Sequence, residues 1–188
     1  MRFSETKLKG AYIIDIEPKG DERGFFARAW CRREFEEAGL DTRVAQVNMS
    51  FSKEKGTLRG MHWQMPPHAE VKLVRCIGGA LYDVIVDLRQ DSPTFLQWIG
   101  VELSADNRRI LLVPEGFAHG FQTLVDDTEV YYQVSEFYAP EAERGARYND
   151  PAFGITWPLP VTTLSQKDAN WPDFEPEQSA IPVAASGG

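Results

Sequence analysis

The residues best suited to chemistry in this sequence lie in the segment 57–64, TLRGMHWQ. Arg59 and His62 stand three positions apart there with a glycine between them, which is unusual in a segment of strand character. Lys72 follows eight residues after the segment, at the start of the apolar run 72–77. A titratable imidazole near cationic groups suits a substrate that is anionic or becomes anionic as it reacts. We therefore expect these residues to form the centre of a functional site.

Strand geometry places a condition on that site. Side chains alternate between the two faces of a flat strand, so Arg59 and His62 would point in opposite directions. A β-bulge at Gly60 would bring both to one face, and a glycine within a strand often marks a bulge. Without such a bulge, Arg59 would be a structural arginine.

The histidines favour acid–base chemistry over metal binding. The chain has only three, His62, His68 and His119, and the residue two positions after His62 is Gln64. The closely spaced His-x-His pair of many metal sites is therefore missing. A metal site shared by His62 and His119 stays as an alternative, while a metal-free acid–base site is the favoured interpretation.

Two further residues could complete acid–base chemistry, and each has a structural alternative. Alternation puts Tyr132 on the same face as Val130 and Val134, which predicts an inward tyrosine. Such a residue is either a core aromatic with a hydrogen-bonded hydroxyl or a general acid that faces a base across a ligand. Asp168 either orients an imidazole and raises its basicity or sits near the start of a helix.

The elements that must position these residues are mostly short strands. Strand character recurs every 8–12 residues, turns rich in Gly, Asp and Pro separate the runs, and residues 32–39 predict one short surface helix ended by Gly39. This pattern predicts an antiparallel sandwich or barrel formed by one domain over residues 1–172, followed by a flexible tail over 173–188. The expected strands cover residues 8–16, 25–30, 44–52, 57–64, 72–77, 80–88, 97–103, 109–113, 117–124 and 128–137.

Composition excludes several classes of protein. A net charge of −8 and a pI near 4.9 argue against nucleic acid as a partner, although a local Arg and Lys cluster can still bind a phosphate-bearing ligand. No apolar run approaches the ~18 residues that would predict a membrane span, and the first residues lack the apolar core of a signal peptide. Cys31 and Cys76 form no CxxC pair, so a cytoplasmic location is expected.

Seven segments together resemble the dTDP-4-dehydrorhamnose 3,5-epimerase family, and the resemblance covers about residues 3–172 in unbroken order. It implies a cupin-like β-jelly roll that forms a homodimer, with no metal and no organic cofactor. The segments are DERGFF (21–26), LRGMHWQ (58–64), KLVR (72–75), DVIVDLR (83–89), SPTF (92–95), PEGFAHGF (114–121) and NDP (149–151).

The resemblance also implies a reaction. The substrate would be a nucleotide-diphosphate 4-keto-6-deoxy sugar, whose 4-ketone acidifies the hydrogens on C3 and C5. His62 would remove those protons with Asp168 behind it, Tyr132 would return a proton from the opposite face, and Lys72 would stabilise the enolate oxygen. Positions that match substrate-binding residues are Arg23, Arg59, His119 and Lys167 for the diphosphate or sugar, Gln46 and Asn48 near the nucleoside and sugar, Glu143 for one more contact, and Tyr138 for stacking on the base.

Three positions depart from the family pattern. Arg28 stands where the family commonly has a glutamate that accepts from the thymine N3–H, and a guanidinium can only donate. Arg28 therefore suggests either a CDP-sugar or another altered nucleotide, or a side chain that turns to solvent. Gln133 and Val47 replace a common lysine and aspartate, which leaves the catalytic pair intact.

Three alternatives to the 3,5-epimerase stay open on the sequence. One is a relative that inverts a single centre or moves the ketone between C3 and C4 of a dTDP- or CDP-sugar. Another is a non-catalytic cupin that binds sugar nucleotides, which is expected to lack His62 or Tyr132. The last, a metal-dependent cupin oxygenase, is disfavoured by Gln64.

Overall fold

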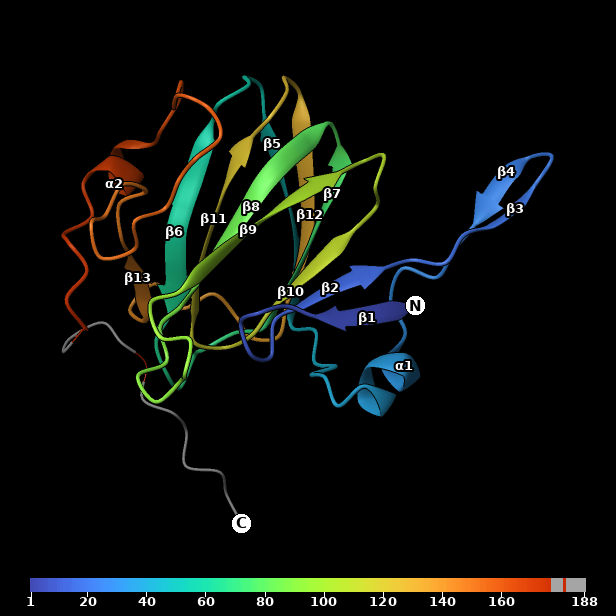
Figure 1. The fold of residues 1–188 in the computed structure, drawn as a ribbon, viewed down its shortest axis with the longest axis horizontal. Coiled ribbons are helices and arrows are strands. Elements are labelled where there is room, and N and C mark those ends of the chain that lie inside the picture. The colour runs from blue at the N-terminus through green and yellow to red at the C-terminus, as the bar shows by residue number, and fades with distance from the viewer. Residues whose placement is uncertain (177–180, 182–188) are drawn as a thin grey trace, which may run out of the picture.

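Two facing antiparallel sheets form the body of the protein in the computed structural model, which describes residues 1–176 and residue 181 (Figure 1). The six-stranded sheet has the order β1 (Arg2–Glu5), β2 (Tyr12–Asp15), β10 (Ile110–Val113), β7 (Lys72–Gly78), β12 (Thr128–Val134) and β5 (Gln46–Ser52). The five-stranded sheet has the order β13 (Glu143–Gly145), β6 (Leu58–Gln64), β11 (Phe117–Thr123), β8 (Ala80–Asp87) and β9 (Trp98–Ser104).

These sheets confirm the predicted all-β, cupin-like jelly roll. The predicted helix is also present as α1 (Arg32–Glu37), and Gly39 follows it with a φ of +70°. Three strands, β1, β13 and β3 (Lys19–Asp21), escaped prediction because three or four residues are too few to show a pattern. The first expected strand begins later than predicted, at Tyr12, because Gly10 has a φ of +87° in a preceding turn.

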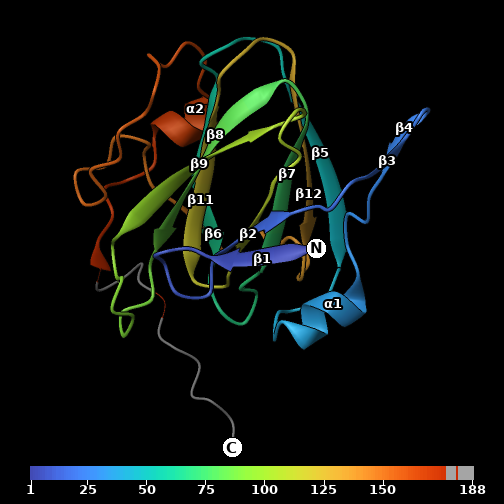
Figure 2. The same cartoon turned by 45° about the vertical axis from the view of Figure 1, so that its right-hand side comes forward.

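A separate hairpin of β3 (Lys19–Asp21) and β4 (Gly24–Phe26) projects from the body. It points away from both sheets in the two views of the fold (Figures 1 and 2). All six residues of its two strands are exposed, so within one chain the hairpin packs against neither sheet.

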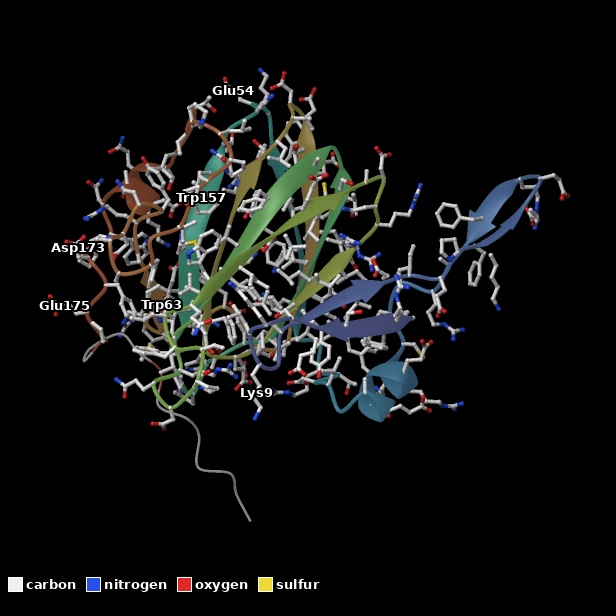
Figure 3. The ribbon with its side chains drawn as sticks, viewed as in Figure 1. Lys9, Glu54, Trp63, Trp157, Asp173 and Glu175 are labelled. Carbon is white, nitrogen blue, oxygen red and sulfur yellow. The ribbon has the colours of Figure 1, made fainter. Side chains whose placement is uncertain are left out.

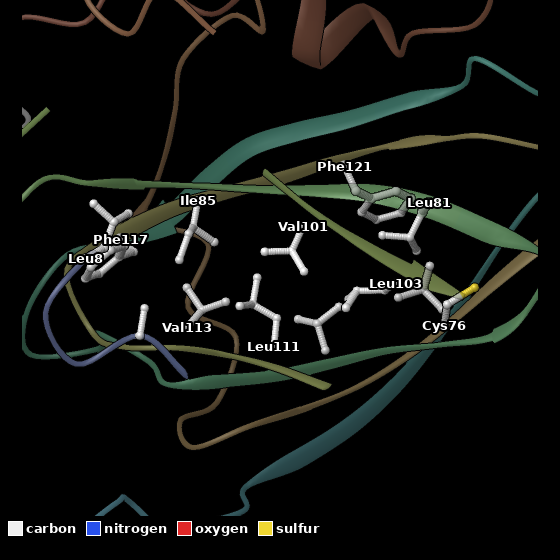
Figure 4. Packing of buried hydrophobic residues seen from close by; sticks show 13 residues of the cluster. Leu8, Cys76, Leu81, Ile85, Val101, Leu103, Leu111, Val113, Phe117 and Phe121 are labelled. Carbon is white, nitrogen blue, oxygen red and sulfur yellow. The ribbon is translucent and has the colours of Figure 1, made fainter. Parts of the chain in front are cut away.

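Buried apolar side chains fill much of the space between the sheets (Figure 4). Leu81 and Leu103 from one sheet meet Leu111 from the other, and all three are fully buried. Burial of each such side chain contributes roughly 1.5–3 kcal/mol relative to its exposure to water. On the outer face of the six-stranded sheet, Phe35 of α1 packs against Ile110 and Leu112.

A third apolar cluster lies on the outer face of the five-stranded sheet and includes residues from the end of the chain. Phe174 packs there against Trp63 and Phe153, with ring centroids 6.1 Å and 5.0 Å apart. Ile181 is buried and forms a parallel bridge with Arg89. These residues belong to the packed domain, although the sequence assigned them to a tail that starts at 173; residues 177–180 and 182–188 of that tail lie outside the described residues.

Within the described part of the chain, no helix is both long enough and apolar enough to cross a membrane.

Candidate functional site

Polar side chains line two adjoining cavities of about 490 Å³ and 370 Å³. The walls come from β5, β7 and β12 of one sheet and from β6 and β11 of the other, together with the segment around α2 (Gln166–Ala169). His62, Lys72 and Tyr132 border both cavities. The first cavity also contains Arg59, His119, Lys167 and Asp168, and the second contains Gln46, Asn48, Tyr138 and Glu143.

The bulge expected at Gly60 is confirmed. His62 pairs with His119 and Arg59 pairs with Phe121, so three residue steps on β6 lie opposite two on β11. Gly60 has a φ of +108°, and a Cβ there would lie 2.5 Å from the Cα of Gly120, so only glycine fits. The extra residue brings Arg59 and His62 to the same cavity.

The neighbour of His62 points the other way, as strand alternation requires. Trp63 is buried on the side of β6 that faces the C-terminal segment (Figure 3). His62 therefore lies on the inner face, where its side chain keeps 34% of its accessible surface. That exposure leaves the ring available to a ligand.

His62 and Asp168 form a hydrogen-bonded pair. The Nε2 of His62 lies 2.5 Å from Oδ1 of Asp168, and Oδ2 accepts from the backbone N–H of Gly60. Burial by itself raises the pKa of this carboxyl, but the hydrogen bond and charge of His62 outweigh it, so the pKa falls below its ordinary value. An ionised carboxylate holds the proton on Nε2 and leaves Nδ1 free to accept one.

Asp168 also has the structural place that the sequence allowed as an alternative. It lies in the first turn of α2, where its backbone N–H donates to the side chain of the N-cap residue, Ser165. The cap therefore fixes the short helix that presents the carboxylate to His62. The hydrogen bond of Asp168 to His62 and its place in the first turn of α2 are therefore compatible.

Tyr132 faces the cavity from the sheet opposite His62. It lies on β12 between Val74 of β7 and Asn48 of β5, and in the described chain its hydroxyl has no hydrogen-bond partner. Burial and the charge of Glu70 raise the pKa of the phenol, while Arg59 acts in the opposite direction. The hydroxyl therefore keeps its proton at neutral pH and is free to donate it to a ligand.

Lys72 completes the border between the cavities. Its ammonium forms an ion pair with the carboxylate of Glu70, and both side chains are largely buried. The positive charge is thus held at a fixed place in the wall that Lys72 shares with Tyr132.

His119 is held from behind by a fully buried carboxylate. Its Nε2 lies 2.9 Å from Oδ1 of Asp83, a residue of β8. Burial raises the pKa of Asp83, against the opposing charges of His119 and Lys72. The pairing fixes the ring of His119 at the edge of the first cavity.

Three predicted residues of the second cavity, Gln46, Tyr138 and Glu143, form a connected network with Lys167 of the first. Lys167 binds both carboxylate oxygens of Glu143, at 2.7 Å and 2.6 Å, and the hydroxyl of Tyr138 donates to the same carboxylate at 2.7 Å. The side chain of Gln46 accepts from the backbone N–H of Tyr138. Hydrogen bonds to Lys167 and Tyr138 outweigh the effect of burial and lower the pKa of Glu143.

Arg23 and Arg28 are not brought to either cavity. Arg23 lies on the projecting hairpin, is 82% exposed and pairs with Asp21. Arg28 pairs with Glu34 of α1 at 3.4 Å and is also exposed. Within one chain, neither residue can contact a ligand in the cavities.

The two other departures from the family pattern point away from the site. Val47 is an exposed residue of β5, and Gln133 lies next to Trp30 in a separate depression on the outer face of the six-stranded sheet. Each alternates with cavity residues, Gln46 and Asn48 for the first and Tyr132 for the second, so these substitutions do not alter the cavity wall.

Among residues 1–176 and 181, no group of three or more His, Cys, Asp or Glu side chains is arranged to hold a metal ion.

Sequence reasoning missed two carboxylates of the site. Glu70 stands two residues before Lys72, and strand alternation could have placed both on one face. Asp83 interrupts an apolar run on β8, and a buried aspartate requires a partner. The sequence does not show which residue pairs with Asp83, since its partner His119 is 36 residues away along the chain.

Comparisons with known proteins agree with this geometry. A family model described as dTDP-4-dehydrorhamnose 3,5-epimerase matches residues 5–176. A curated protein of that name from Shigella flexneri is 45% identical over 175 residues, which are 93% of this chain and 96% of the relative.

Solved structures give the same result. The Bacillus anthracis structure titled dTDP-4-dehydrorhamnose 3,5-epimerase, with TDP and PPi bound, is 46% identical at a TM-score of 0.89 and covers 92% of this chain and 99% of its own. A Legionella pneumophila 3,5-epimerase in complex with dTDP-4-keto-L-rhamnose is 39% identical at a TM-score of 0.83, with coverages of 96% and 92%.

Proposed function

Because this chain belongs to the dTDP-4-dehydrorhamnose 3,5-epimerase family, we propose that it inverts C3 and C5 of dTDP-4-dehydro-6-deoxyglucose to give dTDP-4-dehydro-L-rhamnose. The observation that carries this proposal is the cavity with an imidazole–carboxylate pair on one sheet and a free phenol on the other. A base and an acid on opposite sides of a bound sugar are what inversion at carbon requires.

The reaction begins with removal of a proton next to the ketone. Nδ1 of His62 accepts the proton from C3 or C5. The electron pair of the broken C–H bond moves toward C4, which gives an enolate with its negative charge on the C4 oxygen. Asp168 stabilises the imidazolium that forms, because its carboxylate accepts from Nε2–H. The ammonium of Lys72 stabilises the enolate oxygen, a contribution of about 3 kcal/mol at comparable sites.

Inversion follows from the position of the acid. Tyr132 donates its phenolic proton to the carbon from the face opposite His62, and the C4 ketone reforms. His62 and Tyr132 then exchange protons with solvent and return to their starting states. Every proton taken from the sugar is thus replaced by one of solvent origin.

The second cavity holds the rest of the ligand in this proposal. Gln46, Asn48 and Glu143 contact the nucleoside and sugar, and the exposed ring of Tyr138 stacks on the base. Arg59, His119 and Lys167 bring positive or hydrogen-bonding groups to the diphosphate and sugar. The TDP in the Bacillus anthracis relative supports a thymidine nucleotide over a cytidine one.

The proposal extends to a homodimer. Large apolar side chains are exposed on the edge strand β5, where a solvent-facing position is costly unless it is covered. A second copy seated there could place its projecting hairpin against this cavity, which would give Arg23 and Arg28 a ligand to contact. The exposed apolar residues are Val47, Met49 and Phe51 on β5, with Phe25 and Phe26 on the hairpin.

The dimer is tested by its mass in solution. We expect light scattering to give twice the chain mass, and Met49→Glu to shift it toward that of one chain. A wild-type mass of a single chain would contradict the homodimer and leave Arg23 and Arg28 outside the site.

No cofactor is required in this scheme, because the side chains of the cavity supply the base, the acid and the cation. A cytoplasmic location is consistent with the two unpaired cysteines, Cys31 and Cys76.

The reaction is tested by incubating the protein with the dTDP-linked 4-keto-6-deoxyglucose in D₂O and counting incorporated deuterons by mass spectrometry. We expect two deuterons, and none after His62→Ala. The CDP-linked sugar, run in parallel, is expected to react more slowly. His68→Ala is the matched control, because His68 lines neither cavity.

Other counts would select other functions. One deuteron would indicate a single-centre epimerase or a ketoisomerase. No deuteron with either nucleotide, together with tight binding, would contradict catalysis and indicate a module that binds sugar nucleotides.

A further inference from the structure

Glu70 is a charged residue of the cavity to which the proposed mechanism gives no task. It stands two residues before Lys72, and alternation directs residues 70, 72 and 74 to the same inner face. Val71, between Glu70 and Lys72, is held by two hydrogen bonds to Ser135. Its N–H donates to the side chain of Ser135 at 2.8 Å, and its carbonyl accepts from the N–H of Ser135. The direction of the Glu70 side chain is therefore fixed by the sheet.

The Glu70–Lys72 pair is buried, unlike the other lysine–carboxylate pair of the site. The side chains of Lys72 and Glu70 are 13% and 11% exposed, whereas Lys167, which pairs with Glu143, is 52% exposed. Burying two charges costs several kcal/mol per ion before their attraction is counted. A buried pair on the wall of a cavity is thus weak evidence of a role in stability, and its position points to a role in the site.

Glu70 acts on two of the proposed reacting groups. It contacts the ammonium of Lys72 directly, and its negative charge is one of the causes that raise the pKa of Tyr132. Tyr132, Lys72 and Glu70 also border one cavity. The same carboxylate therefore holds the cation proposed to stabilise the enolate and hinders loss of the proton proposed to be delivered to carbon.

We propose, on the basis of the proposed function above, that Glu70 is a positioning residue that fixes the Lys72 ammonium in the cavity wall and places its negative charge in the same cavity as the Tyr132 hydroxyl. In the resting site the carboxylate neutralises Lys72. When the enolate forms, the ammonium lies between two anions and needs no movement to stabilise the new one. Glu70 itself transfers no proton.

Other titratable groups also face the cavities that Tyr132 borders, and one of them opposes the effect of Glu70 on the pKa of Tyr132. Arg59 of β6 lowers the pKa of Tyr132 and is the opposing influence. His62 of β6 borders both cavities, and Glu143 of β13 lines the second from the far wall. Because Glu70 is the carboxylate whose charge raises the pKa of this phenol, its removal has a defined sign.

The test is Glu70→Gln, which keeps the size of the side chain and removes its charge. We expect the phenolate absorbance of Tyr132, obtained by difference from Tyr132→Phe, to titrate at a lower pH than in the wild type. The alkaline limb of the kcat profile should move by the same amount. Glu70→Asp, which retains the charge, should titrate close to the wild type.

Glu141→Gln is the matched control, since Glu141 is 74% exposed on a loop outside the cavities and should leave both curves unchanged. An unchanged phenolate titration and kcat profile in Glu70→Gln would overturn the proposal, because a purely structural glutamate moves neither. If Glu70→Gln does not fold, Glu70→Ala, which also removes the charge, replaces it, and an unchanged phenolate titration there overturns the proposal.

Failure of the epimerase function is distinguishable from failure of this inference. The phenolate titration needs no substrate, so it reports on Glu70 even if the wild type incorporates no deuterium.

Discussion

The space between the two sheets contains two regions of opposite chemistry, and β7, β11 and β12 contribute residues to both. In one region, Leu81, Val101 and Leu111 are buried in a cluster of apolar side chains (Figure 4). In the other region, His62 and Tyr132 border cavities that are open to ligand. Val130 and Tyr132 belong to the same inward face of β12. Val130 is a member of the apolar cluster and also lines the first cavity, so core and site adjoin there.

The difference lies in how each region is stabilised. An apolar side chain needs only to be covered, and any neighbour of suitable shape will do. A polar side chain that lines the cavities needs one particular partner, as His62 needs Asp168 and His119 needs Asp83. We therefore expect substitutions in the first region to change stability and substitutions in the second to change activity.

The largest expected effect breaks the reaction and spares the fold. Tyr132→Phe removes a hydroxyl that has no hydrogen-bond partner in the described chain, so the melting temperature should stay nearly constant. Loss of a general acid should reduce kcat by about 10²–10⁴-fold, measured by turnover of the dTDP-linked sugar. Tyr131→Phe, on the outer face of the same strand, is the control, and an equal loss of activity in both would refute the assignment.

The opposite outcome is expected for Leu111→Ala in the apolar region. Leu111 is fully buried, and a truncation of this kind costs about 2–5 kcal/mol of unfolding free energy. kcat per folded molecule should be unchanged well below the melting temperature. Chemical denaturation measures the first quantity, and the exposed Val125→Ala should change it by less than about 0.5 kcal/mol. A large drop in kcat without a drop in stability would contradict the separation.

Gly60→Ala should lower both stability and kcat, because the bulge is part of β6 and also brings Arg59 and His62 to the same cavity. The added Cβ would meet Gly120 and the carbonyl of His119, at a φ of +108°. We expect a loss of at least about 1 kcal/mol in stability and a lower kcat. Gly39→Ala, with a φ of +70° and open space around it, controls for backbone strain alone. Equal kcat values in the two variants would show that the bulge does not position Arg59 and His62.

The smallest expected effect is a dependence of stability on acid. The folded-state pKa of Asp168 is lower than its ordinary value of 3.8, so the stabilisation is present above that value and is lost as the pH falls through the folded pKa. Asp168→Asn should therefore show a shallower fall in unfolding free energy below about pH 4 than the wild type. Denaturant titrations at several pH values measure the difference, and parallel curves would contradict it.

Local pattern was sufficient for much of the fold and for the types of residue in the site. Short-range alternation predicts β12, because burial of one face imposes a period of two that is visible in sequence, and apolar runs predict β7 and β8. The glycine of the 57–64 segment likewise predicted the bulge, since few other residues tolerate its backbone conformation. Elements of three or four residues, such as β13, carry too few positions to show a period.

Tertiary structure decided the partners. Asp168 is 106 residues from His62 along the chain, and only the packing of α2 against β6 brings the carboxylate to the ring. Arg23 and Arg28 match binding positions in sequence, yet the hairpin and its connection carry them away from the cavities of their own chain. The sequence did not predict Glu70 as a site residue, because its role depends on a buried lysine and on a phenol from another strand.

The sequence by itself therefore determined the alternating strands, the apolar interior and the presence of an imidazole, a phenol and cations suited to enolate chemistry. These follow from local sterics and from the free energy of burying apolar surface, which act on each segment separately. Only the tertiary structure decided which carboxylate serves which base and which arginines lie outside the cavity. Hydrogen bonds act over about 3 Å, so such pairings exist only once the two sheets and α2 have closed around the site.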